Sequence, residues 1–455
     1  MNDEAKNPNE EIVTPTPETA LDWAKLPGEK PPEPFIRTVW DRVFALIFYA
    51  VGYTYVSRVI GCEQRWFVAV FTALYAAAVL AYFYTKGKKP TASSWFWLAV
   101  LLSIGGSFAL YENASLLGFD LLALHGVAMY WPLCAGGVTL RGSTSSLLPW
   151  DLLNSFITVP FGNFFSLIRS LFGGWNVKKE GLGKRVWSII LGIAALIALL
   201  LLVLPMLASA DAGFEALLAN LDGLFRLEWD ADVLFRLILA LPVSFYLFGH
   251  AYGCINGRHT RHLKTERLAE WGEDCRVLPN TTVYIVLTGI CAVYAVFIAL
   301  QAQNLFSAFA GKLSGTEVYS EFAREGFFDL CRVAAINGVV LLLSDLLATT
   351  SRAKSRALRV FNVILAALTL LILGSAARKM MLYIQVYGLT PKRVLTMAFM
   401  AMLAVLYGGV IVWQYKKFNL IRLAVVFAAV LFAALALCNL AHWILLWNPA
   451  HNLPM

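Results

Sequence analysis

Several ionisable side chains lie inside long apolar stretches of this sequence, where a charge is costly. Glu325, Asp329 and Arg332 follow one another at offsets of four and three, the spacing that places side chains on one face of a helix. Arg378 and Lys379 lie about one turn before the end of the next apolar stretch. An ionisable group at mid-membrane costs roughly 2.5–3.5 kcal/mol on the insertion scale, so such groups are usually paired, cavity-facing or functional. These residues are the first candidates for a site.

One group lies at the beginning of its apolar stretch and the other near the end, so both are expected on the outer side of the membrane. The second helix is expected to continue to Tyr387, because Gly388 is typical of the residue that ends a helix. Thr390 and Pro391 then predict the start of the next helix. We hypothesise one charged cluster in the outer leaflet that could bind an anionic headgroup or solute. The alternative is an ion-pair lock between helices with a structural role only. The cluster consists of Glu325, Asp329, Arg332, Arg378 and Lys379, with Tyr383, Gln385 and Tyr387 around it.

The sequence shows no pattern of a known catalytic, cofactor or metal site. Neither a P-loop nor a GxGxxG or GxSxG motif is present. His259 and His262 are three residues apart but lack the paired cysteines or HExxH spacing of a zinc site, so a solvated charged loop is expected there. The seven cysteines are scattered without a CxxC pair and are expected to be reduced. We expect no catalytic residue, cofactor or metal, and these observations favour a protein that is not an enzyme.

The composition indicates a membrane protein. Of the 455 residues, 59% are hydrophobic and 15% charged, against roughly 45–50% and about 25% in a typical soluble domain. A membrane helix needs about 20 mostly apolar residues. The predicted fold is an all-α polytopic integral membrane bundle of about 11 transmembrane helices plus two amphipathic interfacial helices. The predicted spans are Trp40–Ser57, Trp66–Tyr84, Trp95–Tyr111, Leu117–Val138, Val186–Ala208, Val233–Cys254, Thr282–Gln303, Phe327–Leu347, Val360–Leu382, Val394–Trp413 and Ile421–Leu446.

The basic residues predict the orientation. With the N-terminus inside, 26 of the 37 Lys and Arg residues fall on the cytoplasmic side, 10 fall outside and Arg332 lies within a span. Cytoplasmic loops of membrane proteins carry such an excess, so the N-terminus is predicted to be cytoplasmic and the C-terminus external. Most of the net charge of +8 therefore reflects the orientation of the protein in the membrane. No basic–aromatic platform indicates nucleic acid, and the expected partners are the lipid bilayer and anionic lipid of the cytoplasmic leaflet.

Two connections between spans carry helical apolar stripes. Between Leu148 and Gly174 the apolar positions recur at helical spacing, polar residues fill the other side, and four cations follow up to Arg185. We expect a pair of interfacial helices on the cytoplasmic leaflet; the alternative is a re-entrant or core-packed segment. The second stripe, Phe214–Leu227, predicts a helix on the outer surface. The predicted domains are a disordered cytoplasmic tail (1–36), four membrane helices (37–138), the interfacial segment with its basic tail (139–185), a membrane core (186–446) and a short external tail (447–455).

Two motifs in order resemble a known family. Tyr319–Leu330 reads YSEFAREGFFDL, and Tyr383 is followed by Tyr387-Gly388-Leu389-Thr390. Together with Ser209-Ala210-Asp211, these resemble a bacterial polytopic membrane family catalogued as a domain of unknown function (the 4153/4173 type), over roughly residues 180–445. Phe322 stands where the family usually has Tyr, and Asp329 where it has Glu. The resemblance implies a bacterial inner-membrane location but supplies no activity.

Three functions remain open. The first is transport or handling of a small anionic solute or lipid through the outward-facing charged site. The second is a non-catalytic sensor, scaffold or regulatory subunit of an envelope complex, with protein partners unknown. The third is a membrane-embedded enzyme acting on a lipid-linked substrate. No matched pair of Gly/Pro-broken spans supports a typical secondary transporter.

Overall fold

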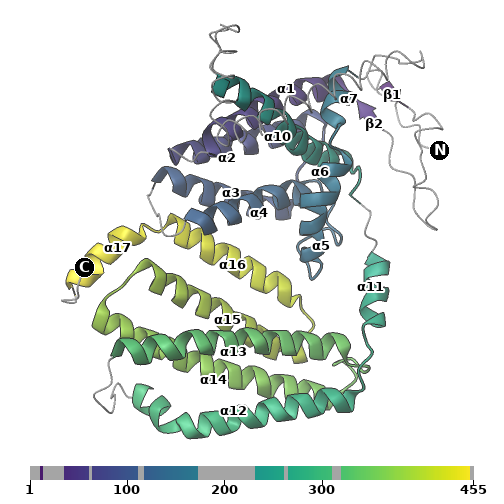
Figure 1. Cartoon of the computed structure of the whole chain (residues 1–455). Helices are drawn as coiled ribbons and strands as arrows, with labels where there is room; N and C mark the ends of the chain where they lie inside the picture. Colours follow the sequence, from purple (N-terminus) through teal and green to yellow (C-terminus); the bar gives the residue numbers. More distant parts are fainter. Residues whose placement is uncertain are drawn as a thin grey trace, which may run out of the picture. The chain divides into compact units, whose positions relative to one another are not determined.

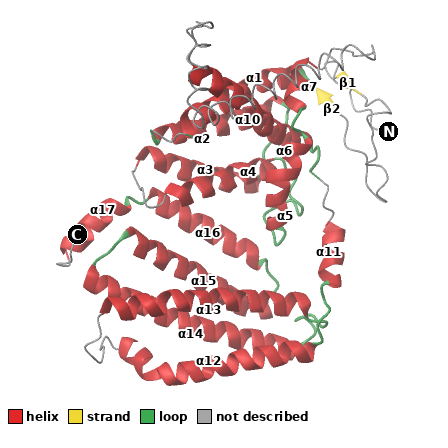
Figure 2. Ribbon diagram, in the orientation of Figure 1, coloured by secondary structure: helices red, strands yellow, loops and turns green. Residues whose placement is uncertain are grey.

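Helices make up most of the computed structural model, which describes residues 11–13, 35–60, 64–110, 117–172, 231–260, 265–309 and 319–450 (Figures 1 and 2). The elements are β1 (Glu11–Val13), β2 (Phe35–Arg37), α1 (Val39–Thr54), η2 (Tyr55–Val59), α2 (Trp66–Thr85), α3 (Ala92–Leu110), α4 (Leu117–Ala135), α5 (Leu148–Leu153), η4 (Asn154–Thr158), α6 (Val159–Gly162), α7 (Ser166–Phe172), α10 (Ala231–Asn256), α11 (Thr265–Asp274), α12 (Asn280–Phe309), α13 (Tyr319–Leu347), α14 (Arg356–Tyr387), α15 (Pro391–Tyr415), α16 (Leu420–Leu437) and α17 (Leu440–Ala450). The predicted span Val186–Ala208 and the predicted surface helix Phe214–Leu227 lie outside the described residues.

Within the described ranges, nine helices are long and apolar enough to cross a membrane. Eight of them coincide with predicted spans, and the ninth is Leu148–Phe172, which was expected to be interfacial. The predicted first and eighth spans are also helical, as α1 with η2 and as α13, but do not belong to these nine. The all-α membrane class is confirmed, whereas the number of eleven spans is not.

The predicted last span, Ile421–Leu446, is two helices rather than one. The backbone is extended at Cys438, where α16 ends. The Asn439 side-chain oxygen accepts a hydrogen bond from the His442 backbone N–H (3.0 Å) and so caps α17. An N-cap asparagine satisfies a backbone donor that a continuous helix would have bonded internally, which explains the break.

The chain folds as two compact units. Unit 1 comprises residues 1–98, 129–138 and 153–262, and unit 2 comprises residues 99–128, 139–152 and 263–455. In unit 1, α1 packs against α2 and α10 around a cluster of aromatic rings: those of Tyr82 and Phe248 are stacked, and that of Phe48 meets them tilted and edge-on. In unit 2, α14 packs against α12, α13 and α15, and α15 packs against α16 (Figure 1).

Two short strands lie in or at the end of the N-terminal tail, whose predicted disorder stays a prediction. Glu11–Val13 pairs antiparallel with Phe35–Arg37, with Ile12 opposite Ile36. The β-branched residues Ile12 and Val13 favour a strand, and Arg37 is buried. The rest of residues 1–34 lies outside the described part of the chain.

The segment 148–172 is amphipathic, as its periodicity predicted, but its polar side is buried. Asn154, Ser155, Asn163, Ser166 and Ser170 are at most 2% exposed, whereas the exposed large side chains between them are apolar: Ile157, Phe161 and Phe165. The segment also departs from one continuous helix: η4 is a π-helical turn, and a turn at 163–165 separates α6 from α7. Of the two interpretations offered by the sequence, this burial favours the core-packed or re-entrant segment.

Candidate functional site

Neutral hydrogen bonds fix the register of α13 against α14. The Ser344 hydroxyl donates to the Asn362 side-chain oxygen (3.1 Å), and the Asn337 side-chain nitrogen donates to Thr369 Oγ1 (2.8 Å). From Ser344 to Asn337 is seven residues toward the start of α13. From Asn362 to Thr369 is seven residues toward the end of α14, so the two helices run antiparallel. A further seven residues bring Leu330 to the level of Ala376.

This register brings the backbones of the predicted charged residues together. Asp329 is one residue from Leu330, and Arg378 is two residues from Ala376, so these backbones lie within about one helical turn in depth. Glu325 precedes Asp329 by four residues and lies about one turn nearer the start of α13. The side chains of Glu325 and Asp329 lie outside the described residues, so their predicted ion pairs with α14 stay a prediction.

The cations of this cluster differ in exposure. Lys379 is 9% exposed and therefore packs inside the bundle, whereas Arg378 is half-buried and Arg332 is exposed. Adjacent residues on a helix point about 100° apart, which explains why Arg378 and Lys379 occupy different surroundings. The cluster therefore combines one ammonium group in the protein interior with guanidinium groups nearer its surface.

Two of the three predicted polar neighbours lie together at the end of α14. The rings of Tyr383 and Tyr387 are 5.1 Å apart, and the Arg393 guanidinium lies 4.2 Å from the centroid of the Tyr383 ring. Arg393 also donates to the backbone oxygens of Tyr387 (2.8 Å) and Gly388. Gln385 is exposed, because it occupies another side of the helix.

Arg393 and Asn448 hold this end of α14, and neither was among the predicted site residues. Gly388 has a positive φ of 81°, and the Asn448 amide lies 3.1 Å from the position of an added Cβ. Asn448 donates to the Leu389 backbone oxygen (3.2 Å) and accepts from the Leu389 N–H (2.7 Å). The sequence did contain a signal for Arg393, because it is the third residue of α15 and follows Lys392 there. Nothing in the sequence around Asn448 predicted its contact with Leu389, 59 residues away.

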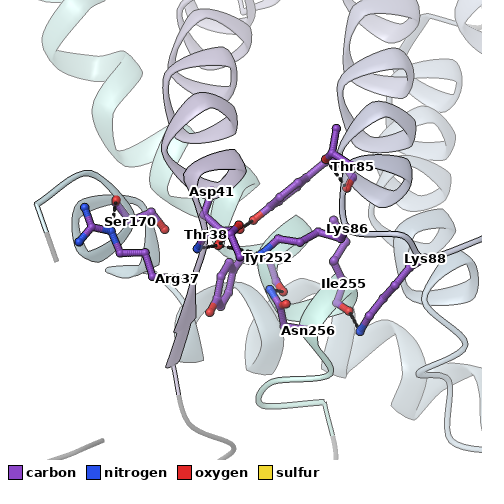
Figure 3. A network of polar contacts seen from close by, with 11 residues as sticks. Arg37, Thr38, Asp41, Thr85, Lys86, Lys88, Ser170, Tyr252, Ile255 and Asn256 are labelled. Atoms are coloured by element: carbon purple, nitrogen blue, oxygen red, sulfur yellow. Dashed lines mark hydrogen bonds and ion pairs between the residues drawn. The ribbon is translucent and has the colours of Figure 1, made fainter. Parts of the chain in front are cut away.

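Unit 1 contains a second charged centre, at the start of α1. Asp41 is fully buried, and its carboxylate accepts hydrogen bonds from the Thr38 N–H (2.7 Å), the Thr38 hydroxyl (2.9 Å), the Tyr82 hydroxyl and the Lys86 ammonium (2.8 Å) (Figure 3). Lys88 donates to the Ile255 backbone oxygen near the end of α10. These hydrogen bonds connect the start of α1 with the end of α2, an arrangement typical of a structural role.

A buried serine–histidine contact in unit 1 does not have the geometry of an activated nucleophile. Ser155 Oγ lies 3.0 Å from His250 Nε2 and 2.5 Å from the Met129 backbone oxygen. Because a carbonyl oxygen only accepts, the single hydroxyl hydrogen of Ser155 is donated to Met129. His250 Nε2 then carries the hydrogen in the contact with Ser155, and it cannot act as a base toward that serine.

Metal binding finds no support in the described part of the chain. No group of three or more His, Cys, Asp or Glu residues there is arranged to hold a metal ion. The beginning of the loop that contains His259 is also not solvated as expected, because Arg258 and Thr260 are buried.

One family profile matches most of the chain. It is described as a domain of unknown function (DUF4153) and matches residues 96–453. The match begins well before residue 180, where the motif resemblance was expected to begin, and so includes α3, α4 and the segment 148–172. No curated protein and no solved structure matches the chain. Since the matched region covers more than half of its residues, this helical membrane protein belongs to the DUF4153 family.

Proposed function

We propose that the protein binds, and transports or otherwise handles, a small anionic solute or lipid at the end of α14. The site consists of Arg378, Lys379, Tyr383, Tyr387 and Arg393. Guanidinium and ammonium groups are the side chains that bind carboxylates and phosphates most strongly. The two tyrosine rings supply amphipathic surface beside them, which suits a ligand at the level of the membrane interface.

The observation that carries this proposal is the burial of Lys379 beside a helix pair whose register is already fixed. The bonds of Asn337 with Thr369 and of Ser344 with Asn362 align α13 and α14 without any charge. A cation in an apolar helix costs several kcal/mol, and alignment of the helices does not require it. An anionic ligand gives the cations at this depth a function.

We also propose a cellular location and a membrane orientation for the protein. The excess of Lys and Arg on alternate loops supports a bacterial cytoplasmic membrane protein with its N-terminus in the cytoplasm. The end of α14 then faces the periplasmic side. A ligand reaches it from outside the cell or from the outer leaflet.

The test uses the full chain in lipid vesicles and two neighbouring substitutions. Arg378→Gln and Lys379→Gln remove cations of the site, and Lys392→Gln removes a cation close to it in sequence. Phosphatidylglycerol retained per protein is measured by native mass spectrometry, and uptake of inorganic phosphate is measured in sealed vesicles. Loss of one charge-assisted contact of about 1.5–3 kcal/mol lowers affinity roughly tenfold or more, so the first two variants should lose ligand and Lys392→Gln should not.

Charge reversal separates a binding site from a structural lock. The variants are Asp329→Arg, Arg378→Asp and the combination of both. If each single reversal prevents folding and the combination restores folding together with full lipid retention, the cluster is a lock and the proposal is wrong. If the Arg378 variant folds but loses anionic ligand, and the combination does not restore binding, the site is functional.

A further inference from the structure

The outward face of the segment after α5 is one continuous stripe. Its exposed side chains recur every three or four residues along η4, α6, the turn at 163–165 and α7. All of them belong to unit 1. The stripe consists of Leu153 (41% exposed), Ile157 (52%), Phe161 (60%), Phe165 (47%), the exposed Arg169 and Phe172 (58%).

The opposite face of the same segment is polar and occupied by protein. The Asn154 side chain donates to the Thr260 backbone oxygen (2.8 Å), and the Asn163 side chain donates to the Arg258 backbone oxygen (3.0 Å). Gly249 and Gly253 of α10 allow this close approach, since an added Cβ would lie 2.7 and 2.5 Å from atoms of Asn163. A helix whose polar side packs on protein and whose aromatic side is exposed is suited to hydrocarbon outside, not to water.

Cations gather around the end of this stripe. Arg169 is its one charged member, and the Arg37 Nε donates to the backbone oxygen of the next residue, Ser170 (3.1 Å). Arg258 is also close: burial lowers its pKa most, Tyr252 raises it, and the charge of Arg169 is a smaller contribution that lowers it. Like charges brought together in this way repel each other, and a bound anion relieves the repulsion.

We propose that this stripe binds an anionic phospholipid, with Arg169 at the phosphate and the apolar residues from Leu153 to Phe165 along an acyl chain. A phospholipid has a charged head and apolar chains, and the stripe has the same division. The cation, Arg169, is in α7, and the apolar surface precedes it in the segment. Arginine also fits phosphate through two parallel N–H donors. This site is in a different unit from the end of α14 and does not rest on the function proposed for that end.

The position of Arg169 agrees with the cytoplasmic leaflet. Four further basic residues follow α7 in the sequence, Lys178, Lys179, Lys184 and Arg185, and Arg141 precedes α5. Cations at both ends of the segment place both ends at the same membrane surface under the positive-inside rule. A segment that enters and leaves on the cytoplasmic side keeps the alternation of the basic loops, whereas a complete crossing would break it.

The test compares arginine substitutions in the full chain, purified in mild detergent. Arg169→Gln removes the cation, Arg169→Lys keeps the charge, and Arg356→Gln removes an exposed arginine in unit 2 as a matched control. Native mass spectrometry after addition of phosphatidylglycerol or phosphatidylcholine measures the lipids bound per chain. A juxtamembrane arginine contributes about 1 kcal/mol to the binding of anionic lipid, or about a fivefold change in affinity. Arg169→Gln should lose that much phosphatidylglycerol affinity, and Arg169→Lys should retain most of it.

Two results would overturn the proposal. The first is equal phosphatidylglycerol affinity in Arg169→Gln and Arg356→Gln. The second is full displacement of the lipid by millimolar inorganic phosphate, because this would show a phosphate site without a role for the stripe. A second variant addresses the stripe itself: Phe165→Ser should weaken binding of phosphatidylglycerol but not of inorganic phosphate. The thermal unfolding temperature of each variant is measured alongside, so that a loss of lipid in a folded chain is distinguished from a loss of fold.

Discussion

Removal of the Asp41 carboxylate should destabilise the protein more than removal of any exposed charge. Asp41→Ala leaves the Lys86 ammonium, whose side chain is 10% exposed, and the fully buried Tyr82 hydroxyl without their acceptor. Breaking a buried ion pair by removing one partner costs about 3–5 kcal/mol, and each buried donor without an acceptor costs about 1–3 kcal/mol. These terms overlap, so we expect a loss of about 3–5 kcal/mol in the free energy of unfolding.

The assay is denaturant unfolding of the full chain in detergent, followed by tryptophan fluorescence. Asp41→Asn keeps the shape and part of the hydrogen bonding and should cost less than Asp41→Ala. Lys86→Met added to Asp41→Asn should recover stability, because the combination removes both charges of one pair. Lys89→Met, in the same loop, replaces an exposed lysine and is the control. The reasoning is refuted if Asp41→Ala unfolds at the same denaturant concentration as Lys89→Met.

Three further substitutions test other contacts. Gly253→Ala should lower the folded yield, because its Cβ would lie 2.5 Å from Val159 Cγ1 and from the Asn163 side chain. Gly106→Ala is the control, because the space around Gly106 is open. Equal folded yields of the two variants by size-exclusion chromatography would contradict this packing. Asn448→Ala removes two hydrogen bonds to Leu389 and should cost about 1–3 kcal/mol; unchanged unfolding would show that the turn does not need them. Ser170→Cys should resist a membrane-impermeant maleimide even in detergent because Ser170 is fully buried, and rapid labelling would favour an interfacial helix instead.

The ends of the predicted helices around Gly388 could be read from the sequence. Thr390 and Pro391 predicted the start of α15, and the Thr390 side chain accepts from the Arg393 N–H. Gly388 was predicted to end α14, and it has a φ of 81° directly after Tyr387. Such capping depends on local chemistry within four residues, so one sequence suffices to predict it.

The contacts that hold the candidate sites could not be read in the same way. Asn448 meets Leu389 across 59 residues, and Asp41 meets Tyr82 across 41. Periodicity identified the stripe of 148–172 but did not determine which side is buried. In water the apolar side of a helix faces the core, whereas in a membrane either side can, because the lipid is itself apolar.

Because either side of a membrane helix can face the core, both units need other features to specify which helices pack together. Apolar packing alone discriminates poorly between partners in a bilayer, so small residues and hydrogen bonds must do so. Unit 1 uses Gly249 and Gly253 against Asn163, and unit 2 uses Asn337 against Thr369. These devices are neutral and buried. The cations at the end of α14 and at Arg169 are not part of these neutral contacts, and we propose that ligand-dependent function lies with them.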